Sequence, residues 1–260
     1  TLRLIVMKTL VTIGRGGTGK SSFSALVAKA LIEAGKTPLL LVDADPDQNL
    51  AEMLGVDMKS QGKATMAELI VDTFIQKGGT TIGVPPTQRI ESRLLSEGMY
   101  ESEKFDFMSV GTKWVEGCYC MPNTALKAAL EGLTKNYTYV IIDSPAGLEH
   151  LNRRIASKVD DIYEMLDHSK KSIDHAKRAF RIAQEVEMKF ENFYLIGGYR
   201  FPDERGNNAE KELNFKYMGK IESDPTVDEY VLDGKSLLDL PSDNLGFLSV
   251  KKILQKTNHL

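Results

Sequence analysis

The 260-residue sequence has few cysteines, little net charge and no long hydrophobic run. Its two cysteines are too few for a disulfide framework. The 33 Lys and Arg against 36 Asp and Glu give a net charge of -3, which argues against a generic nucleic-acid-binding protein, because such a protein would carry a basic excess. No apolar run approaches the ~18 residues of a transmembrane helix. The length suits one large α/β domain or two small ones.

The amino terminus does not resemble a targeting signal. Residues 1–6 contain one arginine and lack both a long apolar core and a small-residue cleavage site. Met7 and Lys8, directly before the first strand-like run, form a more natural start. We therefore interpret residues 1–6 as an extension of a domain that spans residues 7–260. The expected compartment is the reducing cytoplasm, where a close cysteine pair more often binds a metal or takes part in redox chemistry than forms a structural disulfide.

Strand-length apolar runs alternate with helical patterns along most of the chain. The expected strands cover residues 9–13, 38–42, 105–110, 138–142, 162–166, 193–196 and, more weakly, 217–221. The expected helices between them cover residues 21–34, 124–133, 148–158 and 172–187. This alternation predicts a single α/β domain with a doubly wound, mostly parallel sheet covered by helices on both faces.

Two segments fall outside the alternation. Residues 60–104 combine a helical stretch at 64–74 with glycine and proline pairs and a charged run, and we interpret them as an insertion packed on the same domain. Residues 249–256 place Val250, Ile253 and Leu254 on one helical face. That face favours a last helix docked on the core. The alternative is an amphipathic helix that touches a membrane, for which the stretch is short.

A glycine-rich segment follows the first expected strand and precedes the first expected helix. It matches the pattern G-x-x-x-x-G-K-[ST] in full, with Gly14, Arg15, Gly16, Gly17, Thr18, Gly19, Lys20 and Ser21. Glycines let backbone N–H groups turn toward an anion, and the start of the next helix adds a favourable dipole. We expect Lys20 to bind the β- and γ-phosphates and Ser21 to place its hydroxyl on Mg²⁺, with Ser22 also at the nucleotide.

Acidic residues follow two of the expected strands, at the edge where ligands bind in open α/β sheets. Asp43, Asp45 and Asp47 follow one strand, and Asp143 follows another. We expect Asp143 to be the Walker-B carboxylate that holds Mg²⁺ directly or through water, and Gly147 to offer a backbone donor to the γ-phosphate. Each aspartate alone would suit a helix cap or turn equally well, and the phosphate loop favours the nucleotide site.

These motifs resemble the deviant Walker A loop and the two switches of the MinD/ParA-type P-loop ATPases. The loop of that family usually reads K-G-G-x-G-K-[ST]; Asp43-x-Asp45-Pro46 resembles its first switch, and Asp143 to Gly147 resembles its second. Within the family, three features are similar to the CooC-type accessory ATPases of carbon monoxide dehydrogenase maturation. They are Asp45-Pro46-Asp47, the pair Cys118-x-Cys120, and Asp143 with Gly147, Glu149 and His150.

The resemblance implies a MinD-like fold, Mg²⁺-dependent ATP hydrolysis and a homodimer that encloses two ATP molecules. It implies that Asp43 and Asp143 complete the magnesium shell and that Asp45 orients the attacking water. Residue 15 would reach the nucleotide of the other subunit. The resemblance also implies nickel delivery to carbon monoxide dehydrogenase, or to the related acetyl-CoA synthase, with Cys118 and Cys120 as metal ligands.

Two positions depart from the family pattern. Position 15 is Arg where the family has Lys; because Arg can contact phosphate oxygens in pairs, stimulation across the dimer stays chemically reasonable. The asparagine that often follows the late strand of the family and reads the purine is absent, since that run ends at Gly197 and Gly198. Base recognition is therefore open, with Arg200, Asn207 and Asn208 as nearby candidates.

The spacing of Cys118 and Cys120 lets both thiolates face one ion if the segment is extended. Two sulfurs are half of a four-ligand site, and the same pair from a two-fold-related subunit would complete it for Ni²⁺ or Zn²⁺. ATP-driven movement of the subunits would then change the coordination. Buried structural thiols and a redox-active pair are the alternatives, and no cation stands beside the pair to activate a thiol.

Two other functions remain open. A spatial organiser of the MinD or ParA kind would bind a membrane or DNA and would need a longer basic amphipathic tail or a basic stripe. An iron–sulfur carrier resembling nitrogenase reductase would use well-separated cysteines, whereas this chain has one adjacent pair. We therefore expect no nucleic-acid partner and no stable membrane association.

Overall fold

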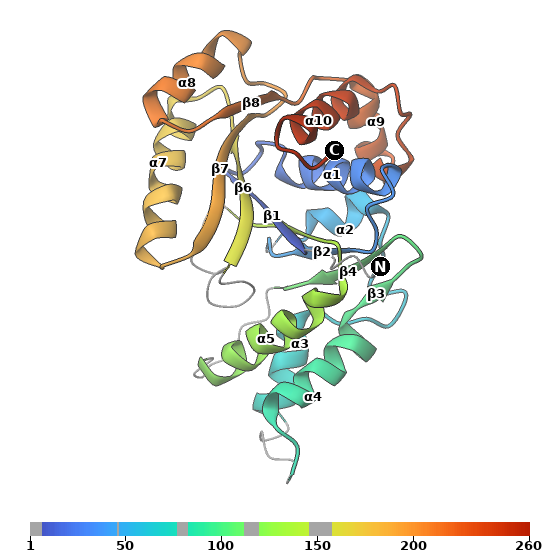
Figure 1. The fold of residues 1–260 in the computed structure, drawn as a ribbon. Coiled ribbons are helices and arrows are strands. Elements are labelled where there is room, and N and C mark those ends of the chain that lie inside the picture. The colour runs from blue at the N-terminus through green and yellow to red at the C-terminus, as the bar shows by residue number, and fades with distance from the viewer. Residues whose placement is uncertain (1–6, 46, 77–82, 112–119, 146–157) are drawn as a thin grey trace, which may run out of the picture.

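The computed structural model describes residues 7–45, 47–76, 83–111, 120–145 and 158–260 (Figure 1). Its strands are β1 (Lys8–Gly14), β2 (Leu39–Asp43), β3 (Tyr100–Glu101), β4 (Phe105–Ser109), β5 (Tyr139–Asp143), β6 (Lys158–Leu166), β7 (Lys189–Gly197) and β8 (Tyr217–Lys220). In these ranges they form one eight-stranded sheet in the order β3-β4-β2-β5-β1-β6-β7-β8. Every neighbouring pair is parallel except β3 with β4.

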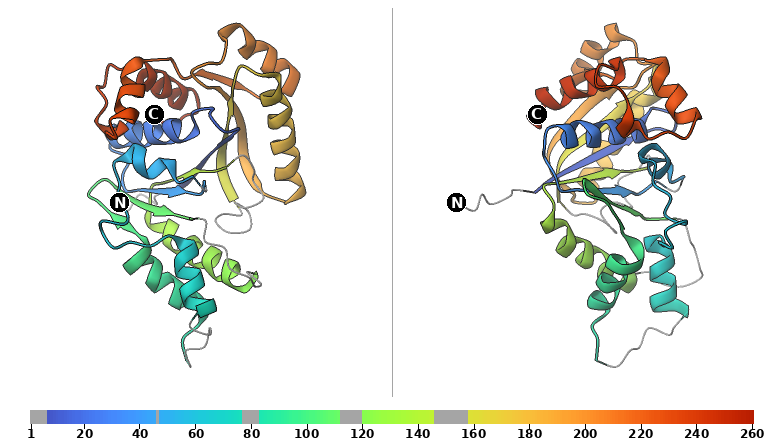
Figure 2. Two further views of the ribbon diagram at one scale, coloured as in Figure 1. Left: turned by 180° about the vertical axis from the view of Figure 1, so that it is seen from behind. Right: turned by 90° about the vertical axis from the view of Figure 1, so that its right-hand side faces the viewer.

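Helices cover both faces of the sheet (Figure 2). They are α1 (Lys20–Glu33), α2 (Asn49–Leu54), α3 (Met66–Ile70), α4 (Pro86–Arg93), α5 (Cys120–Leu133), α7 (Lys170–Glu185), α8 (Gly206–Leu213), α9 (Pro225–Leu232) and α10 (Leu245–Lys256). In Figure 1, α3, α4 and α5 extend away from the sheet on one side, while α1, α9 and α10 pack together on the other. This is the single-domain, doubly wound α/β fold that the sequence predicts.

Alternate residues of the central strands face two separate apolar cores. Leu10 of β1 packs in the core that α1 and α10 cover, whereas Val11 and Ile13 pack in the core that α5 and α7 cover. Because both faces are buried, the strands must be apolar at successive positions rather than at every second one. This explains the continuous apolar runs of the sequence.

The last helix, α10, packs against α1. Its residues Val250, Ile253 and Leu254 are buried in the core on that side of the sheet. The expectation of a docked helix is therefore confirmed, and the alternative of a membrane-touching face is wrong for these residues. Within the described ranges, no helix has the length and apolar character needed to cross a bilayer.

Two expectations about local structure are wrong. Helix α5 begins at Cys120, whereas the sequence predicted a helix that starts at residue 124. Pro122 falls in the first turn of α5, where N–H groups have no partner inside the helix, so a proline does not interrupt it. Lys158, expected to end a helix, begins β6 and pairs with Lys189 of β7. The rest of that expected helix (148–157), Cys118 and Gly147 lie outside the described residues.

Candidate nucleotide-binding site

The glycine-rich loop connects β1 to α1 at the carboxyl edge of the sheet. Gly17 and Gly19 have φ angles of 76° and 89°, in the left-handed region that glycine adopts without strain. Gly19 caps α1 without a side chain, so the first N–H groups of the helix remain open to an anion. A Cβ on Gly16 or Gly17 would meet no atom within 4 Å, so this side of the loop has room for a ligand. At Gly14, a Cβ would lie 2.8 Å from the carbonyl oxygen of Met165.

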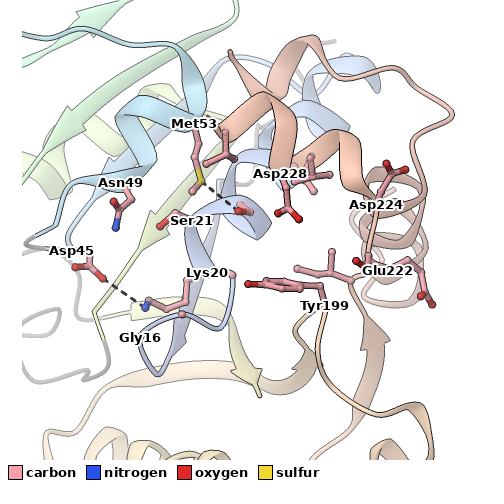
Figure 3. Close-up of a pocket in the computed structure, with 18 of the residues that line it drawn as sticks. Gly16, Lys20, Ser21, Asp45, Asn49, Met53, Tyr199, Glu222, Asp224 and Asp228 are labelled. Atoms are coloured by element: carbon pink, nitrogen blue, oxygen red, sulfur yellow. Dashed lines mark hydrogen bonds and ion pairs between the residues drawn. The ribbon is translucent and has the colours of Figure 1, made fainter. Parts of the chain in front are cut away.

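Lys20 lies buried at the inner side of the loop. Its Nζ donates a hydrogen bond to the carbonyl oxygen of Arg15 at 3.4 Å and lies 3.7 Å from Oδ2 of Asp45. Thr18 donates to the same carbonyl oxygen at 2.8 Å. The structure thus brings together Lys20 and Asp45, two of the three expected catalytic residues (Figure 3).

Asp43 and Asp143 end the neighbouring strands β2 and β5, where they stand opposite each other in the register. Both are fully buried. Burial, together with the charge of Asp143, raises the pKa of Asp43 to about 8. Burial also raises the pKa of Asp143 to about 7, against the opposing effects of the Ser21 hydroxyl and the Lys20 ammonium. The two carboxyls therefore form a buried pair whose ionisation a nearby cation would favour.

The hydrogen bonding of this pair is unequal. The oxygens of Asp43 accept the N–H groups of Asp45 (3.1 Å) and Leu50 (3.0 Å). Among the described residues, neither carboxylate oxygen of Asp143 has a partner with hydrogen-bond geometry, although the nearby Ser21 hydroxyl lowers its pKa. Carboxylate and hydroxyl oxygens are the ligands that Mg²⁺ prefers, so Ser21, Asp43 and Asp143 fit this ion, held directly or through water. Bound there, Mg²⁺ would neutralise charge on a triphosphate.

The guanidinium of Arg15 is hydrogen-bonded to residues of its own chain. Its Nη1 donates to Oδ2 of Asp167 at 2.8 Å and to Oγ of Ser169 at 2.9 Å. Ser169 is the N-cap residue of α7, yet its side chain caps no N–H of that helix and accepts from Arg15 instead. Asp167 also accepts the N–H of Ser169 at 2.7 Å. The expected trans-acting residue is therefore held in cis, between the phosphate loop and the start of α7.

A cavity of about 320 Å³ opens over the loop (Figure 3). One end is lined by Gly16, Gly17, Gly19, Lys20, Ser21 and Ser22. One side is lined by Asp45, Asp47, Asn49 and Met53. The far end is lined by residues that the sequence analysis did not select: Tyr199, Ile221, Glu222, Ser223, Asp224, Val227, Asp228 and Val231. The cavity thus joins the phosphate loop to a region after β7 and β8.

A family profile described as an AAA domain matches residues 7–192. The chain belongs to this family of P-loop ATPases. An uncharacterized ATP-binding protein of Methanocaldococcus jannaschii is 34% identical over 245 residues, which cover 94% of this chain and 95% of that protein. Membership implies that the loop binds ATP with Mg²⁺, in agreement with the buried carboxyl pair.

Two further comparisons bear on function and fold. The carbon monoxide dehydrogenase accessory protein CooC of Rhodospirillum rubrum is 26% identical over 242 residues, or 90% of each chain. The structure of the MinD cell division protein of Aquifex aeolicus matches with a TM-score of 0.68 at 19% identity and covers 97% of each chain. At that identity, the structural match shows a MinD-like fold alone.

The candidate base-reading residues do not line the cavity. Asn207 and Asn208 are exposed on α8, and Arg200 lies 5.4 Å from the ring centroid of Tyr199. One signal in the sequence was overlooked: Asp224 followed by Pro225 is a typical helix start, and α9 begins there, directly after β8.

Only one of the two expected metal-binding cysteines lies among the described residues. Cys120 begins α5, and Cys118 lies outside the described residues. Across the part of the chain that the structure describes, no three His, Cys, Asp or Glu side chains gather as a metal site. The hypothesis of nickel or zinc binding therefore depends on the Cys118-x-Cys120 pair in the sequence.

Proposed function

We propose that the chain is a homodimeric, Mg²⁺-dependent ATPase that helps insert nickel into a client enzyme of the carbon monoxide dehydrogenase type. The observation that carries the ATPase part is the cavity lined by Lys20 and Ser21, two residues that also act on the buried carboxyl of Asp143. The metal-transfer part is supported by the similarity to the CooC accessory protein over 90% of both chains and by the Cys118–Cys120 pair.

In this proposal the loop does its work by positioning and by electrostatics. Lys20 and the open N–H groups of α1 bind the phosphates, and Asp45, beside Lys20, orients the attacking water. Because the guanidinium of Arg15 is held by Asp167 and Ser169 of its own chain, we expect slow hydrolysis by the monomer. Arg15 of a facing subunit would supply the missing charge.

Arg15 couples this step to assembly. Its bonds to Asp167 and Ser169 must break before the guanidinium can reach another subunit. A dimer that forms around ATP would replace these bonds by contacts to phosphate oxygens, which suit the planar guanidinium. ATP binding, dimerisation and release of the start of α7 would then be one linked event.

The metal role is tested by titrating Ni²⁺ and Zn²⁺ into the wild type and a Cys118→Ser/Cys120→Ser variant. We expect the wild type to bind one ion per dimer and the variant to bind none, with ATP affinity unchanged. Lys20→Ala serves as the matched control, because it should lose ATP and keep the thiols. Equal metal stoichiometry in the double variant and the wild type would remove the cysteines from this function.

A second candidate is a spatial organiser that acts on a membrane or DNA, which the MinD-like fold favours. The burial of the apolar face of α10 against α1 speaks against a membrane-binding tail made from that helix. Co-sedimentation with anionic liposomes or DNA, with and without ATP, separates the two. ATP-dependent pelleting would favour the organiser, and none is expected.

A further inference from the structure

The far end of the nucleotide cavity is lined by residues that follow β7 and β8. β7 ends at Gly197, Gly198 follows it, and Tyr199 then lines the cavity. This end of the cavity therefore consists of an aromatic ring, a few aliphatic side chains and several carboxylates.

Tyr199 provides a flat surface beside the phosphate loop. Its Cδ1 and Cε1 lie 3.6 Å from the position that a Cβ on Gly19 would take, and the residue is 37% exposed. Figure 3 shows its hydroxyl pointing into the cavity. Buried Ile221 and partly buried Val227 and Val231 line the same end. An aromatic ring with aliphatic neighbours, one step from the phosphate loop, suits the stacking of a base.

The carboxylates at this end differ in their hydrogen-bond and ion-pair partners. Asp224 accepts N–H groups on both oxygens, from Thr226 and Leu245, each at 3.0 Å. Glu222 lies 3.4 Å from Nζ of Lys220. Asp228, by contrast, has no recorded partner among the described residues. In Figure 3 its carboxylate points into the cavity, while those of Glu222 and Asp224 point away from it.

We infer that Tyr199 and Asp228 select the nucleoside part of the substrate. The ring of Tyr199 carries a purine base, and Asp228 accepts hydrogen bonds from N–H or O–H groups of the nucleoside. An ionised carboxylate can only accept, so a nucleoside that turns a bare acceptor toward Asp228 is rejected. The donor is either the N–H edge of the base or the ribose hydroxyls. This inference rests on the proposed binding of a nucleoside triphosphate.

The test is calorimetric titration of the full-length chain with Mg²⁺ and five triphosphates: ATP, GTP, CTP, purine riboside triphosphate and 2′-deoxyATP. Purine riboside triphosphate lacks the amine of adenine, so its loss of affinity identifies the base edge, whereas a loss with 2′-deoxyATP identifies the ribose. We expect CTP and one of these two to bind on the order of 10-fold more weakly than ATP. Asp228→Ala should remove the discrimination against the donor-lacking analogue.

Matched variants separate this role from a general effect on the fold. Glu222→Ala, which removes a neighbouring carboxylate that points away from the cavity, should keep the wild-type selectivity. Tyr199→Ala should weaken ATP and GTP by on the order of 10-fold and CTP less, and Tyr199→Phe should behave as the wild type. Wild-type selectivity in Asp228→Ala and Tyr199→Ala would overturn the inference. If the wild type bound none of the five triphosphates, the proposed function would be wrong. If it bound all five equally and Lys20→Ala abolished that binding, the proposed function would stand and only the role of Tyr199 and Asp228 would be wrong.

Discussion

The two edges of the central sheet both bury acidic side chains, but they treat them differently. At the amino edge, Asp160 accepts from Nζ of Lys8 (2.9 Å) and from the N–H of Thr9 (2.7 Å). Its neighbour Asp161 accepts from Nδ2 of Asn192 and lies beside Nε2 of His259, both at 2.6 Å. All four carboxylate oxygens of Asp160 and Asp161 therefore have a partner.

At the carboxyl edge, partners are missing on the same central strands. Among the described residues, both oxygens of Asp143, Oγ of Ser144 and Oε2 of Glu164 have none, although all three residues are fully buried. The other oxygen of Glu164 lies 2.8 Å from Nδ1 of His175. An unpartnered buried polar group costs about 1–3 kcal/mol, so this edge gives up stability that the amino edge retains.

The difference separates structural polar groups from functional ones. A fully partnered buried cluster stabilises the fold and offers nothing to a ligand, because its donors and acceptors are occupied. An unpartnered cluster beside the phosphate loop is stabilised only when a ligand supplies the missing contacts. Substitutions at the carboxyl edge should therefore change ligand binding, and those at the amino edge should change stability.

The largest effect is expected for Lys20→Ala at the carboxyl edge. Loss of the ammonium removes charge-assisted hydrogen bonds to phosphate and should weaken ATP by on the order of 100-fold. The free energy of unfolding should change little, because the nearest carboxylate oxygen, on Asp45, lies 3.7 Å away. Calorimetric titration and urea unfolding measure the two quantities. A large loss of stability with ATP affinity intact would break the comparison.

At the amino edge, His259→Ala should do the reverse. It removes a contact to Asp161 in a place where both side chains are about 95% buried, so we expect a loss of about 2 kcal/mol in unfolding free energy. The affinity for ATP should stay within about twofold of the wild type, as binding at the opposite edge does not involve this cluster. Equilibrium urea unfolding checks the first statement. A parallel loss of ATP binding would contradict it.

Glu164→Gln sharpens the comparison through pH. Burial raises the pKa of Glu164, against the effects of His175 and Lys20, so the native state holds its proton at a pH where the unfolded chain has lost it. Stability from this group is therefore lost as pH rises from about 4.5 through the native pKa. As the pH rises above about 4.5, the wild type should lose more stability than Glu164→Gln, by at most ~1.4 kcal/mol per pH unit. Parallel pH profiles of unfolding would exclude this role.

The smallest effect on stability is expected for Asp167→Asn. The Arg15–Asp167 pair is partly exposed, with 35% and 18% of the two side chains accessible, so the loss should be under ~1 kcal/mol. Release of Arg15 should instead raise ATP turnover about 3-fold at low protein concentration, because the guanidinium becomes available to a second subunit. Turnover measured against protein concentration tests this, and Arg15→Ala should be slow at every concentration. An unchanged rate of ATP turnover in Asp167→Asn would show that Asp167 does not restrain Arg15.

The sequence predicts the parts of the fold that local pattern determines. Continuous apolar runs locate β1, β2, β4, β5 and β7, and the glycine loop locates the phosphate end of the site, because its residues adjoin in sequence. The short helices α2, α4, α8 and α9 carry weaker periodic signals and were not predicted. The start of β6 was missed because Lys158 is exposed at the sheet edge and reads as polar.

The other half of the site could not be predicted, since its residues are far apart in sequence. Tyr199 and Asp228 meet Lys20 only because β7 and β8 lie on the same side of β1 in the sheet. The cis contact of Arg15 with Asp167 likewise joins residues 152 positions apart. No periodicity or local motif reports such contacts.

The most direct test compares Asp143→Asn with Asp161→Asn, the same substitution at the two edges. We expect Asp143→Asn to unfold at the same or a higher urea concentration than the wild type and to lose Mg²⁺-dependent tightening of ATP binding. Asp161→Asn should lose about 3 kcal/mol of unfolding free energy and bind Mg²⁺ and ATP normally. If Asp143→Asn were the destabilised variant and kept its Mg²⁺ dependence, the carboxyl edge would not be a ligand site built at the expense of stability.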